Sequence, residues 1–175
     1  DYNGTYDLRA SLLDGTANAN PDVLHIFAVG NDGLDSCPPY PKHYASLPGG
    51  YQASKNSVNV AWLLKPNTDV SPASSRGPTK DGRIKPDIGA IGDGLLSTAP
   101  NTTGYFYDWG SSMASPGITG MAALLTERYR QRNAGANPPA ALLKAFMLNG
   151  ATDRGQPGPD FTFGFGAADL LRSVG

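Results

Sequence analysis

Apolar residues in this chain occur in short continuous runs that alternate with segments of helical spacing. The run over residues 23–29 is nearly continuous and of strand length, and residues 57–63 form a second such run. Runs of this kind are typical of strands buried on both faces of a parallel sheet. Shorter extended pieces are predicted at residues 87–91 and 95–98.

Helical spacing is clearest over residues 112–131. The apolar positions that suit burial on one face of this helix are Met113, Ile118, Met121, Ala122 and Leu125. A short helix is predicted over residues 6–13, ended by Asp14-Gly15. Pro138-Pro139 opens a further helix that continues to residue 148, and residues 167–174 form a last short one. Strands alternating with helices predict an α/β fold with a mainly parallel, buried sheet flanked by helices.

Length and composition indicate one folding unit. The chain has 175 residues, of which 39% are hydrophobic, enough for a single core without a visible domain boundary. Charged residues make up only 17%, and the net charge is −1, so we expect neither a nucleic-acid nor an acidic-membrane partner. No apolar run approaches the roughly 18 residues that a membrane-spanning helix needs, and Asp1-Tyr2-Asn3-Gly4 does not resemble a signal sequence.

Cys37 is the single cysteine, which excludes a disulfide within the chain and a cysteine metal cluster. It is either a buried thiol or the partner of a cysteine on another segment. We expect the buried thiol, because free cysteine packs as a small hydrophobe.

The stretch from Trp109 to Gly117 carries the strongest candidate chemistry. Small residues precede a helix directly here, so a serine hydroxyl would lie at a helix N-terminus, where free N–H groups and the macrodipole favour developing negative charge. That is a suitable place for a nucleophile. The alternative is structural, because serine is a common N-cap and Pro116 is an ordinary residue of a first helical turn.

This stretch, Gly-Ser-Ser-Met-Ala-Ser-Pro at residues 110–116, resembles the nucleophile signature of the subtilisin-like serine peptidases, or subtilases, with Ser112 at the nucleophile position and Ser111 in place of threonine. Residues 26–33, Ile-Phe-Ala-Val-Gly-Asn-Asp-Gly, are similar to the block that supplies the oxyanion-hole asparagine of the family. Residues 74–88 and 161–166 resemble two further family blocks, and all four occur in the family order.

The resemblance implies a subtilisin-like fold whose N-terminal part is missing, so that residues 1–175 form a single partial domain, the C-terminal part of a peptidase catalytic domain. It implies a serine endopeptidase that hydrolyses peptide bonds through an acyl-enzyme on Ser112. The Ser112 N–H and the Asn31 amide would hold the oxyanion. Ala28, Val29 and Gly30 would line the pocket for the substrate side chain that precedes the scissile bond. Without the resemblance, Asn31 between two glycines would be interpreted as a turn residue.

Subtilases carry their triad in the order Asp, His, Ser, and the blocks that hold the Asp and the His are absent ahead of Asn31. His25 lies inside a predicted strand, where we expect a hydrogen-bonded core histidine, and His43 follows the Asn31 block. We assign neither as the base. The acidic residues without family context are likewise not assigned as the orienting acid: Asp1, Asp7, Asp14 and Asp22.

We therefore expect the Asp and the His to come from a missing N-terminal segment of the same catalytic domain, and the isolated chain to be inactive. The alternative is a catalytically inactive subtilase-like module for peptide binding or interaction. Protein or peptide substrates and a secreted or cell-envelope location follow from the family alone. No cofactor is expected. The resemblance implies that calcium could bind in loops, as in many subtilases, but the spacing of the loop aspartates does not identify a site: Asp32, Asp35, Asp93 and Asp108.

Overall fold

The computed structural model describes residues 4–66 and 68–174. Its centre is a three-stranded parallel sheet in the order β1 (Ile26–Ala28), β2 (Val58–Leu63) and β3 (Ile88–Ile91). Ala28 lies opposite Val60, and Val60 lies opposite Ile88. The carboxyl ends of the three strands therefore lie at the same edge of the sheet, where ligands bind in open α/β folds. The predicted α/β fold with a parallel sheet flanked by helices is confirmed.

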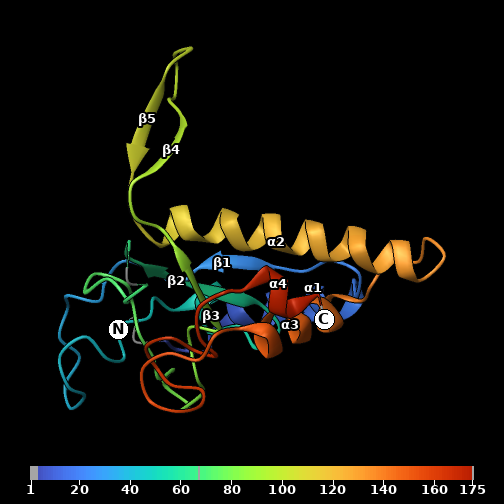
Figure 1. Ribbon diagram of the computed structural model, residues 1–175. Coiled ribbons are helices and arrows are strands. Elements are labelled where there is room, and N and C mark those ends of the chain that lie inside the picture. The colour runs from blue at the N-terminus through green and yellow to red at the C-terminus, as the bar shows by residue number, and fades with distance from the viewer. Residues whose placement is uncertain (1–3, 67, 175) are drawn as a thin grey trace.

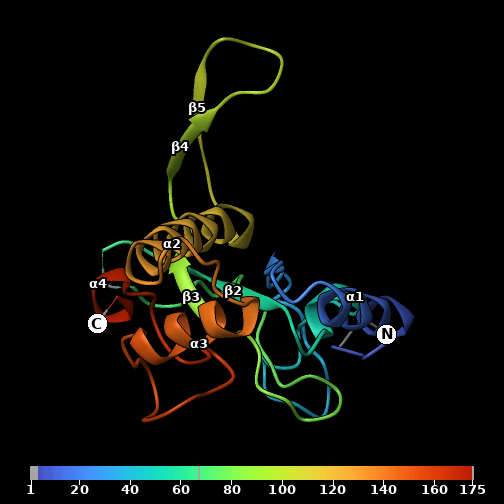
Figure 2. The same cartoon turned by 90° about the vertical axis from the view of Figure 1, so that its right-hand side faces the viewer.

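Helices surround this sheet (Figures 1 and 2). The longest, α2 (Ser111–Arg132), runs along the sheet and packs on all three strands. Two further helices, α3 (Ala140–Gly150) and α4 (Leu170–Ser173), pack against each other and against α2. Helix α1 (Leu8–Ala19) lies beside the 3-10 turn η1 (Gly50–Ala53), which contacts β1, as Figure 2 shows.

The main hydrophobic core lies between α2, α3 and strands β2 and β3. Its buried members come from these elements and from the end of α3: Val58, Val60, Ile88, Ala114, Ile118, Met121, Ala122, Leu125, Leu143, Met147 and Ala151. The apolar positions of α2 recur every three or four residues, so one face of the helix points into this core. Of the five positions expected to be buried there, Met113 is only half-buried.

Strands β4 (Leu95–Thr98) and β5 (Tyr105–Asp108) form an antiparallel hairpin that projects from the rest of the molecule next to the start of α2 (Figures 1 and 2). Strand β4 was predicted with these bounds. Strand β5 was not, because it is a short exposed aromatic segment without an alternating pattern. The helix predicted over 112–131 lies within one residue of the observed bounds at either end.

Three other expectations are corrected. Helix α1 does not end at Asp14-Gly15 but continues through them to Ala19. Asp14 is turned inward, and its carboxylate accepts hydrogen bonds from Ser54 Oγ at 2.6 Å and from the Asn56 N–H at 2.9 Å, so tertiary contacts override its turn preference. Strand β1 covers three residues and is half-buried, because it is an edge strand among those described. Cys37 is half-buried rather than buried.

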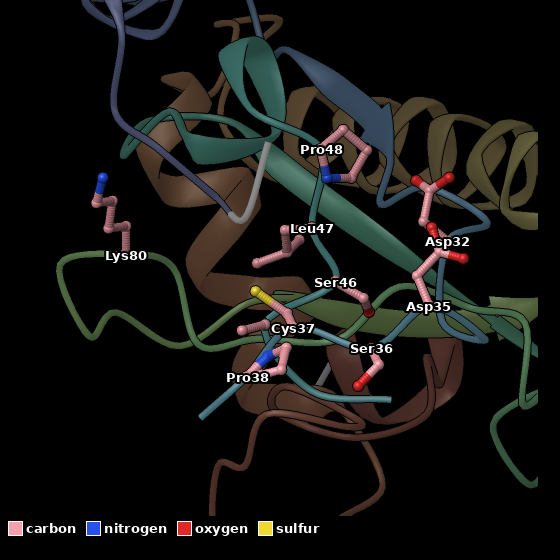
Figure 3. A pocket seen from close by; sticks show the side chains of 10 residues that line it. Asp32, Asp35, Ser36, Cys37, Pro38, Ser46, Leu47, Pro48 and Lys80 are labelled. Carbon is pink, nitrogen blue, oxygen red and sulfur yellow. The ribbon is translucent and has the colours of Figure 1, made fainter. Parts of the chain in front are cut away.

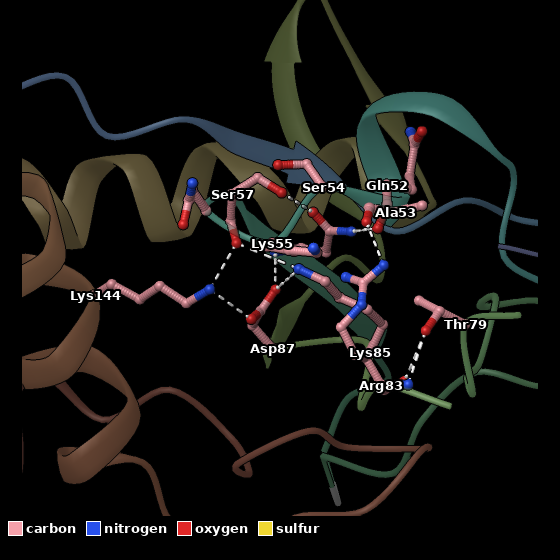
Figure 4. A network of polar contacts seen from close by, with 12 residues as sticks. Gln52, Ala53, Ser54, Lys55, Ser57, Thr79, Arg83, Lys85, Asp87 and Lys144 are labelled. Atoms are coloured by element: carbon pink, nitrogen blue, oxygen red, sulfur yellow. Dashed lines mark hydrogen bonds and ion pairs between the residues drawn. The ribbon is translucent and has the colours of Figure 1, made fainter. Parts of the chain in front are cut away.

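A buried cluster of charges fixes β2 against β3 and α3 (Figure 4). The Asp87 carboxylate accepts hydrogen bonds from the Asn59 N–H at 2.8 Å, from Lys85 Nζ at 2.6 Å and from Lys144 Nζ at 2.8 Å. Both ammonium groups also donate to the Ser57 carbonyl, at 3.3 and 2.8 Å. Two cations on one carboxylate are tolerated because each ammonium has more than one acceptor.

In the part of the chain that the structure describes, no helix is long and apolar enough to cross a bilayer.

Candidate active site

The first turn of α2 presents Ser112 to solvent. Gly110 caps the helix with a φ of 139°, a conformation that favours glycine, and Ser111 is fully buried as the first helical residue. Ser112 is exposed. The Ser112 N–H makes no hydrogen bond to any residue described, because it lies in the first turn and has no acceptor within the helix; the amides of Met113 and Ala114 donate to the Gly110 carbonyl. A free hydroxyl and a free N–H thus lie together at a helix N-terminus.

Asn31, which is 80 residues before Ser111 in the sequence, lies beside the first turn of α2. It follows β1 after Val29 and Gly30, and its side-chain Oδ1 accepts hydrogen bonds from the Ser111 N–H at 3.0 Å and Ser111 Oγ at 2.9 Å. A backbone N–H can only donate, so the Asn31 atom that faces Ser111 must be the oxygen. The amide nitrogen Nδ2 therefore points away from Ser111, and a Cβ added to Gly110 would lie 3.3 Å from it.

Two buried serines hold the turn that carries Asn31. Ser111 Oγ accepts from the Gly30 N–H at 3.3 Å and lies 3.1 Å from the Gly30 carbonyl. Ser75 contacts the turn from the opposite side, because its N–H donates to the Gly30 carbonyl at 3.0 Å and its Oγ accepts from the Asp32 N–H at 3.0 Å. Neither serine was assigned a role from the sequence, although Ser75 belongs to the family-like block at residues 74–88. Each fixes the backbone on one side of Asn31.

Ala28, Val29 and Gly30 form the strand end that leads to Asn31. Ala28 is half-buried and its carbonyl accepts from Gln52 Nε2 at 3.3 Å, whereas Val29 is fully buried. Gly30 has a φ of 113°, and an added Cβ would lie 2.7 Å from both Pro48 Cδ and Ser75 Oγ. Only glycine fits this position, so the approach of Pro48 and Ser75 depends on it.

A cavity of about 710 Å³ is lined by the long loop after Asn31 and by residues 45–48 (Figure 3). Its lining includes the carboxylates of Asp32 and Asp35, the thiol of Cys37 and the ring of Pro48. None of the residues predicted to bind substrate, Ala28, Val29 or Gly30, lines it, and neither does Ser112. The cavity is thus a neighbour of the candidate active site and is not formed by it.

The two histidines lie apart from Ser112 in the hydrogen-bond network. His25 is half-buried with its Nε2 buried and unpartnered, so the expectation of a hydrogen-bonded core histidine is wrong. His43 donates from Nδ1 to the Gly33 carbonyl. Neither imidazole forms a hydrogen bond with Ser112. Among the residues described, no group of three or more His, Cys, Asp or Glu side chains is placed to hold a metal ion.

Four acidic residues were not assigned a catalytic role from the sequence, and two of them make structural hydrogen bonds. Asp7 caps α1, accepting from the N–H groups of Arg9 and Ala10 at 2.9 and 3.0 Å. These backbone hydrogen bonds, the one from Ala10 first, hold the pKa of Asp7 below its usual value. Asp14 binds the loop after η1, Asp22 is exposed, and Asp1 lies outside the described residues.

A parallel α/β sheet with a serine at a helix N-terminus beside an asparagine amide defines a class of hydrolase-like sites. Residues 3–166 match the model of the subtilase family, Peptidase_S8, and the chain belongs to this family of peptidases.

Among its relatives, pyrolysin from Pyrococcus furiosus is 37% identical over 114 residues, which are 65% of this chain and 7% of pyrolysin. The PII-type proteinase of Lactococcus lactis subsp. cremoris is 38% identical over 101 residues, 55% of this chain and 5% of the relative. The chain thus spans less than a tenth of the length of these two curated relatives.

Solved structures agree in fold. The chain resembles the prenylagaramide maturation protease PagA with a TM-score of 0.74 and 24% identity, over 98% of this chain and 56% of that one. It resembles a lanthipeptide protease with a TM-score of 0.70 and 24% identity, over 94% and 54% of the two chains. It resembles the CspB protease of Clostridium perfringens with a TM-score of 0.66 and 28% identity, over 78% of this chain and 30% of that one.

Proposed function

We propose that this chain is the part of a serine endopeptidase that carries the nucleophile and the oxyanion hole. Ser112 Oγ would attack the carbonyl carbon of a peptide bond and form an acyl-enzyme, which water then hydrolyses. The observation that supports this most strongly is the pair of unused donors at the start of α2. The Ser112 N–H has no partner among the described residues, and neither has Asn31 Nδ2, because both hydrogen bonds from Ser111 are accepted by the Asn31 oxygen.

These two donors would bind the oxyanion of the tetrahedral intermediate. Donors that are already oriented need no rearrangement when negative charge develops, which is why they stabilise the transition state more than the ground state. Ser111 fixes the orientation of Asn31 at a distance of 80 residues in sequence, and Ser75 supports the same turn from behind. The positive end of the α2 macrodipole would add to this stabilisation.

The segment Ala28–Gly30 would form one wall of the site for the substrate side chain before the scissile bond. Its backbone is held by Gln52 and Ser75, and the side chain of Val29 points into the protein, so backbone groups rather than side chains would contact a peptide. We further propose protein or peptide substrates and a secreted or cell-envelope location, both on the basis of the family.

The general base and its orienting acid would come from a polypeptide segment outside this chain. A serine hydroxyl is a weak nucleophile at neutral pH and requires a base within hydrogen-bond distance. Neither His25 nor His43 forms a hydrogen bond with Ser112, and Asp7 and Asp14 are engaged in capping and loop contacts. The isolated chain would therefore show almost no turnover, since loss of the triad histidine alone lowers kcat by about 10⁶-fold in a subtilase.

A fluorophosphonate serine probe tests the proposal. Native material is separated by gel and intact mass, labelled, and digested to locate the modified residue. We expect a second polypeptide segment to accompany the chain and the label to lie on Ser112, with no label in Ser112→Ala. Asn31→Leu should lower turnover of a peptide substrate by about 10²–10³, the loss measured for the equivalent asparagine of a family member, with a nearly unchanged KM.

The alternative function is a catalytically inactive module that binds peptides. It would be favoured if the 175 residues fold stably by themselves, bind peptides and resist the probe. An Asn31→Leu variant that retains full turnover would exclude the proposed oxyanion hole while leaving the acyl-enzyme on Ser112 possible.

A further inference from the structure

A groove lies between the C-terminal half of α2 and the helices α3 and α4. Its volume is about 520 Å³, which falls within the roughly 300–1,000 Å³ of typical ligand sites. The three helices pack against one another there, and Figure 2 shows them side by side. The groove is separate from the candidate active site, because a rise of about 1.5 Å per residue places Ser112 and Arg128 about 24 Å apart along α2.

The floor of the groove is apolar. Leu125 lines it and is 3% exposed, and Phe146 and Val174 line it and are half-buried. Both half-buried side chains pack against the main hydrophobic core. An apolar side chain that enters the groove therefore exchanges water for contacts that are continuous with this core, which is favourable in proportion to the area buried.

Three arginines form the rim, and we call the site the arginine groove. Arg128 and Arg132 come from α2 and Arg172 comes from α4, and all three are exposed. Among the residues described, none of the three forms an ion pair. Arg128 Nη1 lies 3.5 Å from Gln131 Oε1, which carries no charge. The guanidinium groups thus meet at one groove without an anionic partner from the described chain.

The acidic residues closest to these arginines along the chain have other contacts. Glu127 borders a second hollow, on a neighbouring face of α2. The Asp169 carboxylate caps α4 by accepting from the Arg172 N–H at 3.1 Å. Glu127 is also the only acidic residue in the sequence from 109 to 152. The positive charge at the groove is therefore a local excess, although the net charge of the whole chain is −1.

Helix dipoles account for only part of this charge. Arg132 and Arg172 lie in the last turns of their helices, where a cation is favourable, but Arg128 lies before the last turn of α2. Arg128 and Arg132 are four residues apart on one helix face, an arrangement in which like charges repel. Arg172 brings a third like charge from another helix. The fold gains little by collecting these charges, whereas a bound anionic group would interact favourably with all three.

We propose that the arginine groove binds an acidic polypeptide segment that carries an apolar side chain. Carboxylates of the segment pair with Arg128, Arg132 and Arg172, because the planar guanidinium group matches the geometry of a carboxylate. The apolar side chain enters between them and covers Leu125 and Phe146. This floor favours a peptide over a nucleic acid, whose backbone is bound mainly through its charge. The site does not involve Ser112, so the inference is independent of the proposed function.

Fluorescence anisotropy of a rhodamine-labelled Glu-Glu-Phe-Leu-Glu-Glu hexapeptide tests the groove. The 175-residue chain is titrated into the peptide at physiological ionic strength. We expect saturable binding that weakens by about tenfold in the double variant Arg128→Gln/Arg132→Gln, because each exposed guanidinium–carboxylate pair contributes up to about fivefold. Arg172→Glu should also weaken binding, since it places a carboxylate at the rim.

Two altered peptides separate the charge from the apolar contact. One has glutamine in place of every glutamate, and the other has Ser-Ser in place of Phe-Leu. Each should bind the parent chain about tenfold more weakly than the hexapeptide does, the first because it cannot pair with the arginines and the second because it buries no apolar side chain.

A matched variant separates the groove from the net charge of the chain. Lys42→Gln/Arg154→Gln removes two positive charges from exposed side chains outside the groove, so its net charge equals that of the double arginine variant. This control should bind the hexapeptide as tightly as the parent does. All variants should melt close to the temperature of the parent chain, because substitutions at exposed positions outside the ion pairs change stability little.

Equal affinity of the parent and the double arginine variant would overturn the proposal, and so would an equal loss in the control. A Ser-Ser peptide that binds as tightly as the hexapeptide would show attraction by charge alone and would overturn it as well. Vesicles containing phosphatidylserine and a short DNA duplex are titrated in the same way. Tighter binding of either, lost in the double arginine variant, would assign the groove to a membrane or to nucleic acid in place of an acidic peptide.

Discussion

Replacement of Asp87 by asparagine should destabilise the chain more than the loss of any surface charge. Asp87 accepts hydrogen bonds from the Asn59 N–H and from the ammonium groups of Lys85 and Lys144. Asparagine has nearly the same volume but no charge, and only one of its two terminal atoms can accept. One ammonium would therefore face an NH₂ group, and both would lose their counter-charge (Figure 4).

The magnitude follows from burial. The Lys85 side chain is 3% exposed and that of Lys144 is 20% exposed, so Lys85 in particular cannot recover hydration when its partner is removed. Removing one partner of a buried ion pair costs about 3–5 kcal/mol. With a urea slope of about 2 kcal/mol/M, the midpoint of unfolding should fall by about 1.5–2.5 M. That is a large share of the roughly 5–15 kcal/mol that stabilises a typical domain.

Urea unfolding followed by circular dichroism at neutral pH measures the loss. Asp81→Asn is the matched control, because the Asp81–Arg83 pair is 2.9 Å long but exposed, with side-chain exposures of 46% and 26%. Such pairs contribute about 0–1 kcal/mol. A midpoint shift for Asp87→Asn no larger than that of the control would refute the reasoning.

The pH dependence of the Asp87→Asn variant provides a second check. Burial lowers the pKa of Lys85, and the Asp87 charge opposes this effect, so loss of the charge lowers the pKa further. Between this lowered pKa and the unfolded value of 10.5, the unfolded chain binds more protons than the folded one, and stability rises with pH. The variant should therefore regain part of its stability on the alkaline side. Adding Lys85→Met, which removes the buried charge, should abolish this gain.

Two further outcomes are expected of the chain itself. Burial raises the pKa of Asp14, but hydrogen bonds from Ser54 and from the backbone N–H groups of Lys55 and Asn56 outweigh burial and hold the pKa below 3.8. The stabilisation from the Asp14 carboxylate is therefore present above pH 3.8 and is lost as the pH falls through the folded pKa. Thermal melts of the parent and of Asp14→Asn should converge in acid. Met147→Ala removes a side chain with 0% exposure and should cost about 2–5 kcal/mol in urea unfolding, whereas Leu171→Ala, at a residue 81% exposed, should change stability by less than about 0.5 kcal/mol.

The elements that sequence predicted best are those whose pattern is local. Strand β2 and helix α2 were found within one residue of their ends, because a continuous apolar run and a 3.6-residue spacing are properties of the segment itself. Pro139 did precede α3, as its fixed φ suits a helix start, and the helix continued two residues beyond the predicted end at Leu148.

The elements that sequence missed depend on partners elsewhere in the chain. Asp14-Gly15 has the composition of a helix stop, but the loop at Ser54 provides hydrogen bonds that draw Asp14 inward, and α1 continues. The burial of β1 was overestimated for a related reason. An apolar run shows that a strand can be covered on both faces, whereas its actual cover depends on which elements pack beside it.

The sequence supplied candidate residues for the site, but it did not show the contacts between them. The resemblance to a family named Ser112 and Asn31, but nothing in either local sequence shows that Ser111 Oγ contacts Asn31 Oδ1 across 80 residues. The same holds for Ser75 and the Asp32 N–H, 43 residues apart. Contacts between residues so far apart in the sequence form because the fold brings the carboxyl ends of the parallel strands to one edge of the sheet.

The arrangement at α2 also weighs against the structural explanation of its serines. An N-cap serine would use its own hydroxyl to accept a helix N–H, but the N-cap of α2 is Gly110, which has no side chain, and the first helix N–H is accepted by Asn31 Oδ1. Ser111 is occupied in holding Gly30 and Asn31. The Ser112 hydroxyl is therefore not needed to cap the helix, and Asn31 uses only its side-chain oxygen to accept from Ser111. The hydroxyl of Ser112 and the amide nitrogen of Asn31 are the two groups that this helix start exposes without using, which is what an acyl-transfer site needs and a helix cap does not.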